Sequence, residues 1–263
     1  MPKCTVVAFD PPTSFDPIDQ FGRVGILEMA TEYICADEIR KILPKTGVTF
    51  HVNRMDNGVG TCKSLDGLNG FKSDVQRATR GLLPDVGVDV VLFGCTAASA
   101  LIGPDVLAEE IRKAQPSAQP VTPFSAAVQA LRVLGVKKLS VLTPYLKPID
   151  EKVCEQLEQA GFEVLSYAGF GAPTSRQTSS TPPSFIREQA LKVMHPDADA
   201  LFVSCTSIRV VDLIDELERS IGRPVVTANQ ALAWQGWQCL SRDHPGIPHV
   251  NGYGRLFHVK LSD

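Results

Sequence analysis

Two segments of the chain repeat each other. Residues 88–96 read VDVVLFGCT and residues 198–206 read ADALFVSCT. Each begins at an Asp turn, continues as a short apolar run, and ends on a small residue followed by Cys-Thr. Apolar runs of this length between turn residues are typical of buried parallel strands. The repeat therefore predicts two similar α/β lobes, with Cys95 and Cys205 at equivalent strand ends.

The flanking sequence extends this match. Each repeat is followed by a short helix and then a Pro-Val strand, at 120–122 and 224–227, and the strand 23–27 resembles 138–142. We expect the two lobes to join near residue 123. Residues 1–122 with about 228–263 would form the N-terminal lobe around Cys95, and residues 123–227 the C-terminal lobe around Cys205.

Strand patterns alternate with helix patterns along the rest of the chain. This alternation predicts βαβ units, that is, mainly parallel sheets flanked by helices. The predicted strands are 5–9, 23–27, 49–53, 89–93, 120–122, 138–143, 163–167, 200–204 and 224–227. The predicted helices are 30–43, 68–83, 106–114, 125–134, 149–160, 185–194, 211–221 and 230–240. The hydroxyl-rich stretch 169–184 has no hydrophobic period, and we expect it to form a loop that acts as a lid.

Composition excludes several classes of partner. The chain has 26 basic and 29 acidic residues, a net charge of −3, and no basic cluster of note. We therefore expect neither a nucleic-acid nor a membrane partner. The sequence shows no signal peptide and no stretch near 18 apolar residues, so we expect a cytoplasmic protein.

The seven cysteines lack the spacing of a metal or redox site. No CxxC pair occurs among them, so we expect free thiols, no metal site and no cofactor. Most free cysteines are buried and behave as small hydrophobes. Cys95 and Cys205 differ from the other five because the repeat places both at a strand end, where ligands bind in parallel α/β folds.

Unpaired backbone N–H groups at these turns can lower the pKa of a thiol and bind an anion. Two facing thiols can racemise a carbon, one removing a proton while the other delivers one. Alternatively, a thiolate can add to an electron-poor double bond, which rotates and re-forms when the thiolate leaves. We expect a carboxylate substrate, bound by these N–H groups and by the hydroxyls of Thr96 and Thr206. The five histidines lie away from both turns, so we do not expect a Cys–His pair.

The chain resembles the aspartate/glutamate racemase superfamily over roughly residues 20–240. Within it, the chain is similar to the branch of maleate cis–trans isomerases, arylmalonate decarboxylases and ectoine-utilisation protein A. The motifs are LFGCTAASALIGPDVL, PVTPFSAAVQALRVLG, SVLTPY and SCTSIRVVDLIDELE, and the first two, with LEMATEY, look closest to ectoine-utilisation protein A. The resemblance implies two flavodoxin-like lobes with the active site in the cleft between them, and usually a homodimer.

The resemblance also implies site residues. In maleate isomerases the two cysteines, a Tyr in the TPY turn and two Asn hold the substrate. Cys95, Cys205 and Tyr145 match, with Cys95 expected as the attacking thiolate and Cys205 as the proton donor.

Neither Asn of the maleate isomerases has a match. Glu32 or Thr31 stands at the first position, and Ser175 or Arg176 lies where the lid Asn is expected. A carboxylate at residue 32 would repel a dicarboxylate and suit a substrate with an amino group, as in the ectoine pathway.

Two other functions stay open. Arylmalonate decarboxylases keep only the second cysteine, so a decarboxylase using Cys205 alone is one alternative, although the presence of Cys95 argues against it. A small-molecule-binding protein without catalysis on the same fold is the other.

Overall fold

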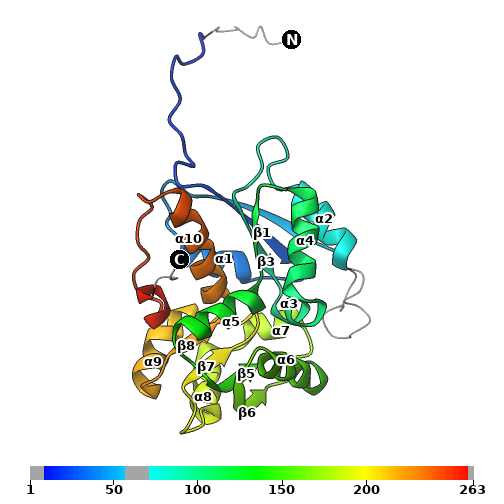
Figure 1. Ribbon diagram of the computed structural model, residues 1–263, viewed down its shortest axis with the longest axis vertical. Coiled ribbons are helices and arrows are strands. Elements are labelled where there is room, and N and C mark those ends of the chain that lie inside the picture. Colours follow the sequence, from blue (N-terminus) through cyan, green and yellow to red (C-terminus); the bar gives the residue numbers. More distant parts are fainter. Residues whose placement is uncertain (1–8, 57–70, 260–263) are drawn as a thin grey trace, which may run out of the picture.

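The computed structural model describes residues 9–56 and 71–259. Their strands form two parallel sheets of four strands each, in the orders β2-β1-β3-β4 and β6-β5-β7-β8 (Figure 1). The first sheet holds β1 (Arg23–Met29), β2 (Thr49–Met55), β3 (Val90–Gly94) and β4 (Gln119–Val121). The second holds β5 (Lys138–Thr143), β6 (Glu163–Gly169), β7 (Ala200–Val203) and β8 (Val225–Thr227). The shared strand order confirms the predicted α/β fold of two similar lobes.

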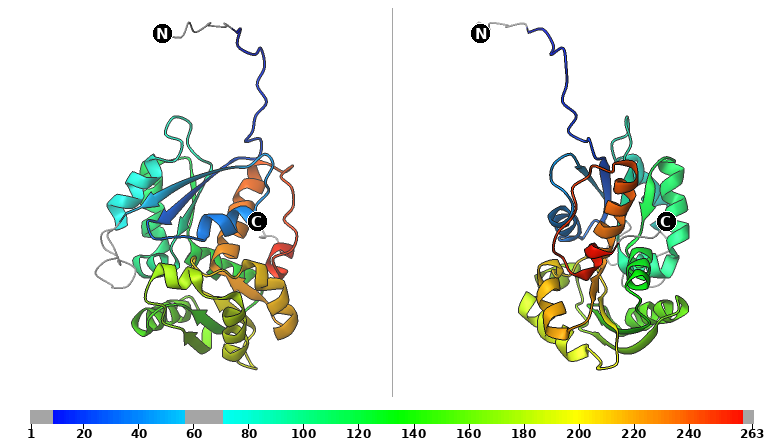
Figure 2. Two further views of the ribbon diagram at one scale, coloured as in Figure 1. Left: turned by 180° about the vertical axis from the view of Figure 1, so that it is seen from behind. Right: turned by 60° about the vertical axis from the view of Figure 1, so that its left-hand side comes forward.

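Helices cover both sheets. Those of the first lobe are α1 (Cys35–Ile42), α2 (Phe71–Arg80), α3 (Thr96–Ile102) and α4 (Pro104–Ala114). Those of the second are α6 (Lys147–Gln159), α7 (Ser175–Ser180), α8 (Pro183–Val193), the 3-10 turn η3 (Val211–Leu213) and α9 (Ile214–Ile221). Residues 9–20 extend away from the first lobe, whereas Gly254 and Arg255 near the other end of the described chain bond to α9 of the second lobe (Figure 2). No helix in residues 9–56 or 71–259 is long and apolar enough to cross a membrane.

The Asp that opens each repeat ties the two central strands of its sheet together. Asp89 accepts a hydrogen bond from the backbone N–H of Arg23 at 2.7 Å. Asp199 accepts one from the N–H of Lys138 at 2.8 Å. Each carboxylate thus joins the start of β3 or β7 to the start of β1 or β5. The Asp of each repeat therefore aligns the starts of the two central strands in its own sheet.

Two long helices link the lobes. α5 (Pro123–Val133) follows β4, α10 (Ala228–Asp243) follows β8, and the two pack against each other. α10 also packs on α1, β3, β4 and β8, and α5 contacts α3, β3 and β8. The 3-10 turn η4 (Arg255–His258) packs on α10. Because each helix contacts both lobes, the predicted division near residues 123 and 228 stays a prediction.

The structure differs from the predicted elements in three places. The helix expected from residue 30 begins at Cys35, because residues 30–34 form a turn that carries Glu32. The stretch 169–184 is not a continuous loop, since α7 forms within it where Thr174 accepts a hydrogen bond from the N–H of Gln177 at 3.1 Å. The strand expected at 5–9 lies outside the described residues except for Phe9, which is exposed and not in a strand.

A buried carboxylate on α1 joins the lobes. Glu38 is 3% exposed and accepts hydrogen bonds from the N–H groups of Val210 and Val211, at 2.9 and 3.2 Å. It also accepts one from Asn229 Nδ2 at 2.8 Å. Burial raises the pKa of Glu38 to about 7, although these hydrogen bonds oppose the rise.

We predict that this carboxyl makes stability depend on pH. Its folded pKa lies above the ordinary value of 4.5, so between these two pH values the folded state binds more protons than the unfolded state. The free energy of unfolding should then fall as pH rises through this window, by at most about 1.4 kcal/mol per pH unit. Urea unfolding at a series of pH values should show this slope in the wild type and a flatter one in Glu38→Gln. The exposed Glu109→Gln serves as the control, and equal slopes in all three proteins would contradict the prediction.

Candidate active site

Cys95 lies where β3 ends. It is the N-cap residue of α3 in extended conformation (φ −150°, ψ 108°) and is 7% exposed. The glycine before it fits tightly, because a Cβ on Gly94 would come 2.7 Å from the carbonyl oxygen of Leu27. This close approach to β1 requires Gly at the end of β3 and fixes the position of Cys95.

Cys205 lies where β7 ends, in a different backbone conformation. Its φ of +123° falls in a region that non-glycine residues rarely adopt, and such strain costs about 1–3 kcal/mol. Cys205 is partly exposed, and its Sγ accepts a hydrogen bond from the N–H of Ser207 at 3.4 Å. The surrounding structure must hold this strained turn in place.

Contacts from the first lobe and from α10 supply that restraint. The hydroxyl of Thr206 donates to the carbonyl oxygen of Gly94 at 3.0 Å, and Asn229 Nδ2 donates to the carbonyl oxygen of Thr206 at 2.8 Å. The Thr206 bond joins the turn after β7 to the last residue of β3. The two cysteine-bearing strand ends are therefore in direct contact.

Tyr145, which follows β5, completes a cluster with the two cysteines. Burial raises the pKa of Tyr145 well above its ordinary value of 10, and the nearby Cys205 and Cys95 raise it further. The phenol therefore stays protonated at neutral pH and can donate a hydrogen bond. Its hydroxyl lies close enough to Ser204 and Cys205 to interact with both side chains.

Cys205 is held in its thiol form. Burial and the negative charge of Glu32 raise the pKa of Cys205 to about 12, against hydrogen bonds from the N–H of Ser207 and from Tyr145. The N–H of Ser207 lowers the pKa of Cys205, as expected of a strand-end N–H group, but burial and Glu32 outweigh it. At neutral pH this side chain is suited to donate a proton.

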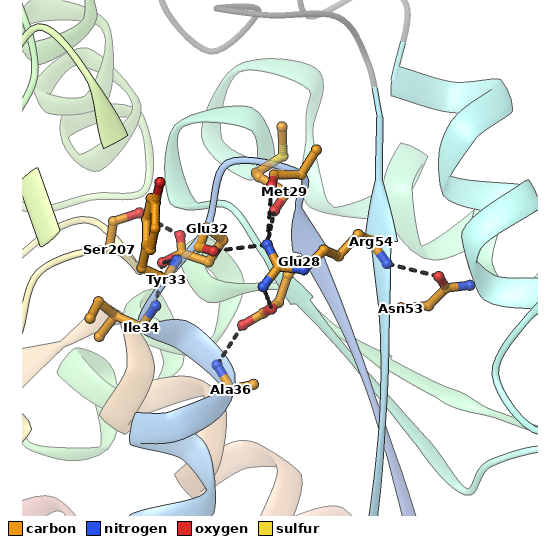
Figure 3. A network of polar contacts seen from close by, with 10 residues as sticks. Glu28, Met29, Glu32, Tyr33, Ile34, Ala36, Asn53, Arg54 and Ser207 are labelled. Atoms are coloured by element: carbon orange, nitrogen blue, oxygen red, sulfur yellow. Dashed lines mark hydrogen bonds and ion pairs between the residues drawn. The ribbon is translucent and has the colours of Figure 1, made fainter. Parts of the chain in front are cut away.

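Glu32 lies beside Cys205 and is anchored on both of its oxygens (Figure 3). Oε1 accepts hydrogen bonds from the N–H groups of Tyr33 and Ile34, each at 2.8 Å. Oε2 accepts one from the hydroxyl of Ser207 in the second lobe. The side chain is 3% exposed. Glu32 is thus a fixed, buried link between the turn after β1 and the turn after β7.

Arg54 on β2 holds the turn that carries Glu32 (Figure 3). Its Nη1 donates to the carbonyl oxygens of Ala30 and Glu32 at 3.1 and 2.8 Å. Its Nη2 lies 3.2 Å from Oε2 of Glu28, whose Oε1 accepts a hydrogen bond from the N–H of Ala36 at the start of α1. The turn is therefore fastened to β1, β2 and α1.

Two buried hydroxyl groups, those of Thr96 and Ser204, stand next to the cysteines in the sequence. Among the described residues, the buried Oγ atoms of Thr96 and Ser204 meet no atom in full hydrogen-bond geometry, although Ser204 approaches Tyr145. A buried polar group without a partner is costly. The hydroxyl of Thr96 therefore keeps unused hydrogen-bonding capacity next to Cys95.

The remaining predicted residues lie at the edge of this cluster. The hydroxyl of Thr31 is 3.0 Å from that of Ser175, the first residue of α7, so the turn after β1 contacts the predicted lid. Arg176 is exposed. The structure thus brings Cys95, Cys205 and Tyr145 together with Glu32, Thr96 and Thr206, while the roles of Thr31, Ser175 and Arg176 stay predictions.

Two important residues were missed from the sequence. Ser207 follows the Cys-Thr of the second repeat, whereas Ala97 stands at the same place in the first. This difference between the repeats could have indicated its special role. Asn229 lies in the first turn of α10, and its side chain bonds Glu38 and the carbonyl oxygen of Thr206. The helix itself is capped by Thr227, which accepts a hydrogen bond from the N–H of Gln230 at 3.2 Å. In the described part of the chain, no three His, Cys, Asp or Glu side chains form a group that could hold a metal ion.

The chain is similar to known proteins in both sequence and structure. The chain is 26% identical over 245 residues to the maleate isomerase of Nocardia farcinica, covering 89% of this chain and 94% of the relative. Among solved structures, it is similar to a maleate isomerase variant from Pseudomonas putida S16 with maleate (TM-score 0.80, 24% identity, 89% and 96% covered).

A second solved structure is the maleate cis–trans isomerase of N. farcinica, in a cysteine-to-serine mutant with a covalently bound succinylcysteine intermediate. Its TM-score is 0.78 at 23% identity, with 89% of this chain and 97% of that chain covered. The model of the arylmalonate decarboxylase family matches residues 57–257. The match confirms the branch that the motifs indicated, and the chain belongs to the arylmalonate decarboxylase family.

Proposed function

We propose that the chain is a cofactor-independent isomerase that uses Cys95 and Cys205 on a small carboxylate. The observation that supports this most is the cluster of both thiols and Tyr145 where the two sheets meet. A single proton donor would suffice for a decarboxylase, whereas two thiols can act on both ends of a bond or both faces of a carbon.

The proposed cis–trans reaction begins with the Cys95 thiolate. Its sulfur adds to the electron-poor double bond of a substrate such as maleate, forming a C–S bond and a carbanion beside the other carboxylate. Cys205 gives its proton to that carbon, leaving a single C–C bond that can rotate. The Cys205 thiolate then takes the proton back, the C–S bond breaks, and the trans product leaves with Cys95 restored as thiolate.

The high pKa of Cys205 supports this division of roles. A thiol with a pKa of about 12 is a poor nucleophile at neutral pH because it is rarely deprotonated. The Cys205 thiol is instead suited to give its proton to the substrate carbon and to take it back. In the N. farcinica relative, a mutant that lacks one cysteine still holds a succinyl group on a cysteine, which fits separate roles for the two thiols.

We propose that Thr96 and Tyr145 bind the substrate carboxylates. Thr96 has a buried hydroxyl without a partner among the described residues, and Tyr145 stays protonated between the two thiols. Thr206, whose hydroxyl is engaged by Gly94, and Ser175 and Arg176 in the lid are further predicted substrate residues. Homodimerisation, a cytoplasmic location and a substrate from ectoine breakdown also stay predictions.

A decarboxylase acting through Cys205 alone is the second candidate. It is favoured by the family match to arylmalonate decarboxylase over residues 57–257. In that reaction Cys205 would protonate the carbanion left when CO₂ departs, and Cys95 would have no part in the chemistry.

The two functions are separated by proton NMR of the purified enzyme with maleate or an arylmalonate and no added cofactor. We expect conversion of maleate to fumarate, lowered about 10²-fold or more in both Cys95→Ala and Cys205→Ala. Cys154→Ala, which removes a buried thiol on α6, should keep wild-type activity. Release of CO₂ from an arylmalonate that survives Cys95→Ala would instead establish the decarboxylase.

A further inference from the structure

The contact between Glu32 and Ser207 has a consequence for Cys205. The Ser207 hydroxyl donates to Glu32, and the Ser207 N–H donates to the sulfur of Cys205 at 3.4 Å. A single residue therefore connects the buried carboxylate to the thiol. The connection crosses from the first lobe to the second.

The position of this carboxylate is firmly set. Two N–H groups hold Oε1 of Glu32, and Arg54 holds the backbone of the same turn through carbonyl oxygens (Figure 3). Because Oε2 is taken by Ser207, both oxygens of Glu32 are already engaged. The side chain is also only 3% exposed, so a substrate ammonium group has little access to it. The geometry therefore favours a role toward Cys205 over direct binding of an amino group.

From this arrangement we infer that Glu32 is a positioning residue: its bond to Ser207 keeps Cys205 in place, and its negative charge keeps that side chain a thiol ready to act as the proton donor. The donor role rests on the proposed function. The effect of Glu32 on the thiol is a separate property that can be measured without turnover.

The charges around Cys205 support the inference. The titratable groups that face it are Glu32 from the turn after β1, Cys95 after β3, Tyr145 after β5 and Cys35 on α1. Glu32 is the acidic residue among them whose negative charge opposes formation of the thiolate. Ser207 also orients the strained turn, because its hydroxyl ties that turn to the first lobe.

Glu32→Gln removes the charge and can keep the contacts, because its amide oxygen can accept from the N–H groups of Tyr33 and Ile34 while its Nε2 donates to the Ser207 hydroxyl. The rate at which iodoacetamide labels Cys205 is measured between pH 6 and 10 by peptide mass spectrometry. Without the negative charge, the thiolate fraction should increase, and labelling at pH 8 should be about tenfold faster for each unit by which the pKa falls. Glu218→Gln is the matched control, since Glu218 is also buried and bonded to backbone N–H groups but lies by Val225 and Arg255.

Ser207→Ala separates the charge from the hydrogen bond. It removes the hydroxyl and leaves the carboxylate in place, so labelling of Cys205 at pH 8 should not accelerate, while kcat should fall as the turn loosens. This variant also tests the inference if Glu32→Gln does not fold. Unchanged labelling in folded Glu32→Gln, equal acceleration in Glu218→Gln, or faster labelling in Ser207→Ala would each overturn it.

The test is independent of the proposed reaction. If Glu32→Gln accelerates labelling but no isomerisation is found in the wild type, the link to Cys205 stands and the proposed function fails. If the wild type isomerises its substrate but Glu32→Gln leaves the labelling of Cys205 unchanged, the proposed function stands and the link between Glu32 and Cys205 fails.

Discussion

The hydrogen bond from the Thr206 hydroxyl to the Gly94 carbonyl is the contact on which the site depends. It joins the ends of the two central strands that carry the cysteines, across the boundary between the lobes. Without it, the strained backbone of Cys205 would lose a restraint from the opposite lobe. A glycine is required at the other end of this bond because β3 approaches β1 too closely for a side chain. The close packing of β3 on β1 at Gly94 thus helps to set the backbone position of Cys205.

The two lobes are similar in fold but not in the chemistry of their strand ends. Cys95 has an extended backbone at the start of α3, whereas Cys205 has a positive φ and lies beside a buried carboxylate. Ser207 replaces the alanine of the first repeat and connects that carboxylate to the thiol. A symmetric fold therefore carries an asymmetric pair, which is what distinct nucleophile and proton-donor roles require.

The sequence predicted the sheets well because its signals there are local and repeated. Apolar runs and Asp turns located β1, β3, β5 and β7, and the repeat paired Cys95 with Cys205. Helix α7 could not be predicted because its polar residues have no hydrophobic period and its start depends on the Thr174 cap. The pKa of Cys205 was missed for a different reason. It depends on burial and on Glu32, which is distant in sequence and arrives through tertiary packing.

The central claim is that Cys95 attacks the substrate while Cys205 carries the proton. It is tested most directly by incubating Cys205→Ser with maleate, measuring the intact mass, and mapping the modified peptide. The account predicts a stable addition of one substrate per chain, located on Cys95, because the carbanion takes its proton from water while the thiolate that would remove it again has been lost. An adduct on another cysteine, or none on a folded variant that still isomerises maleate, would contradict it.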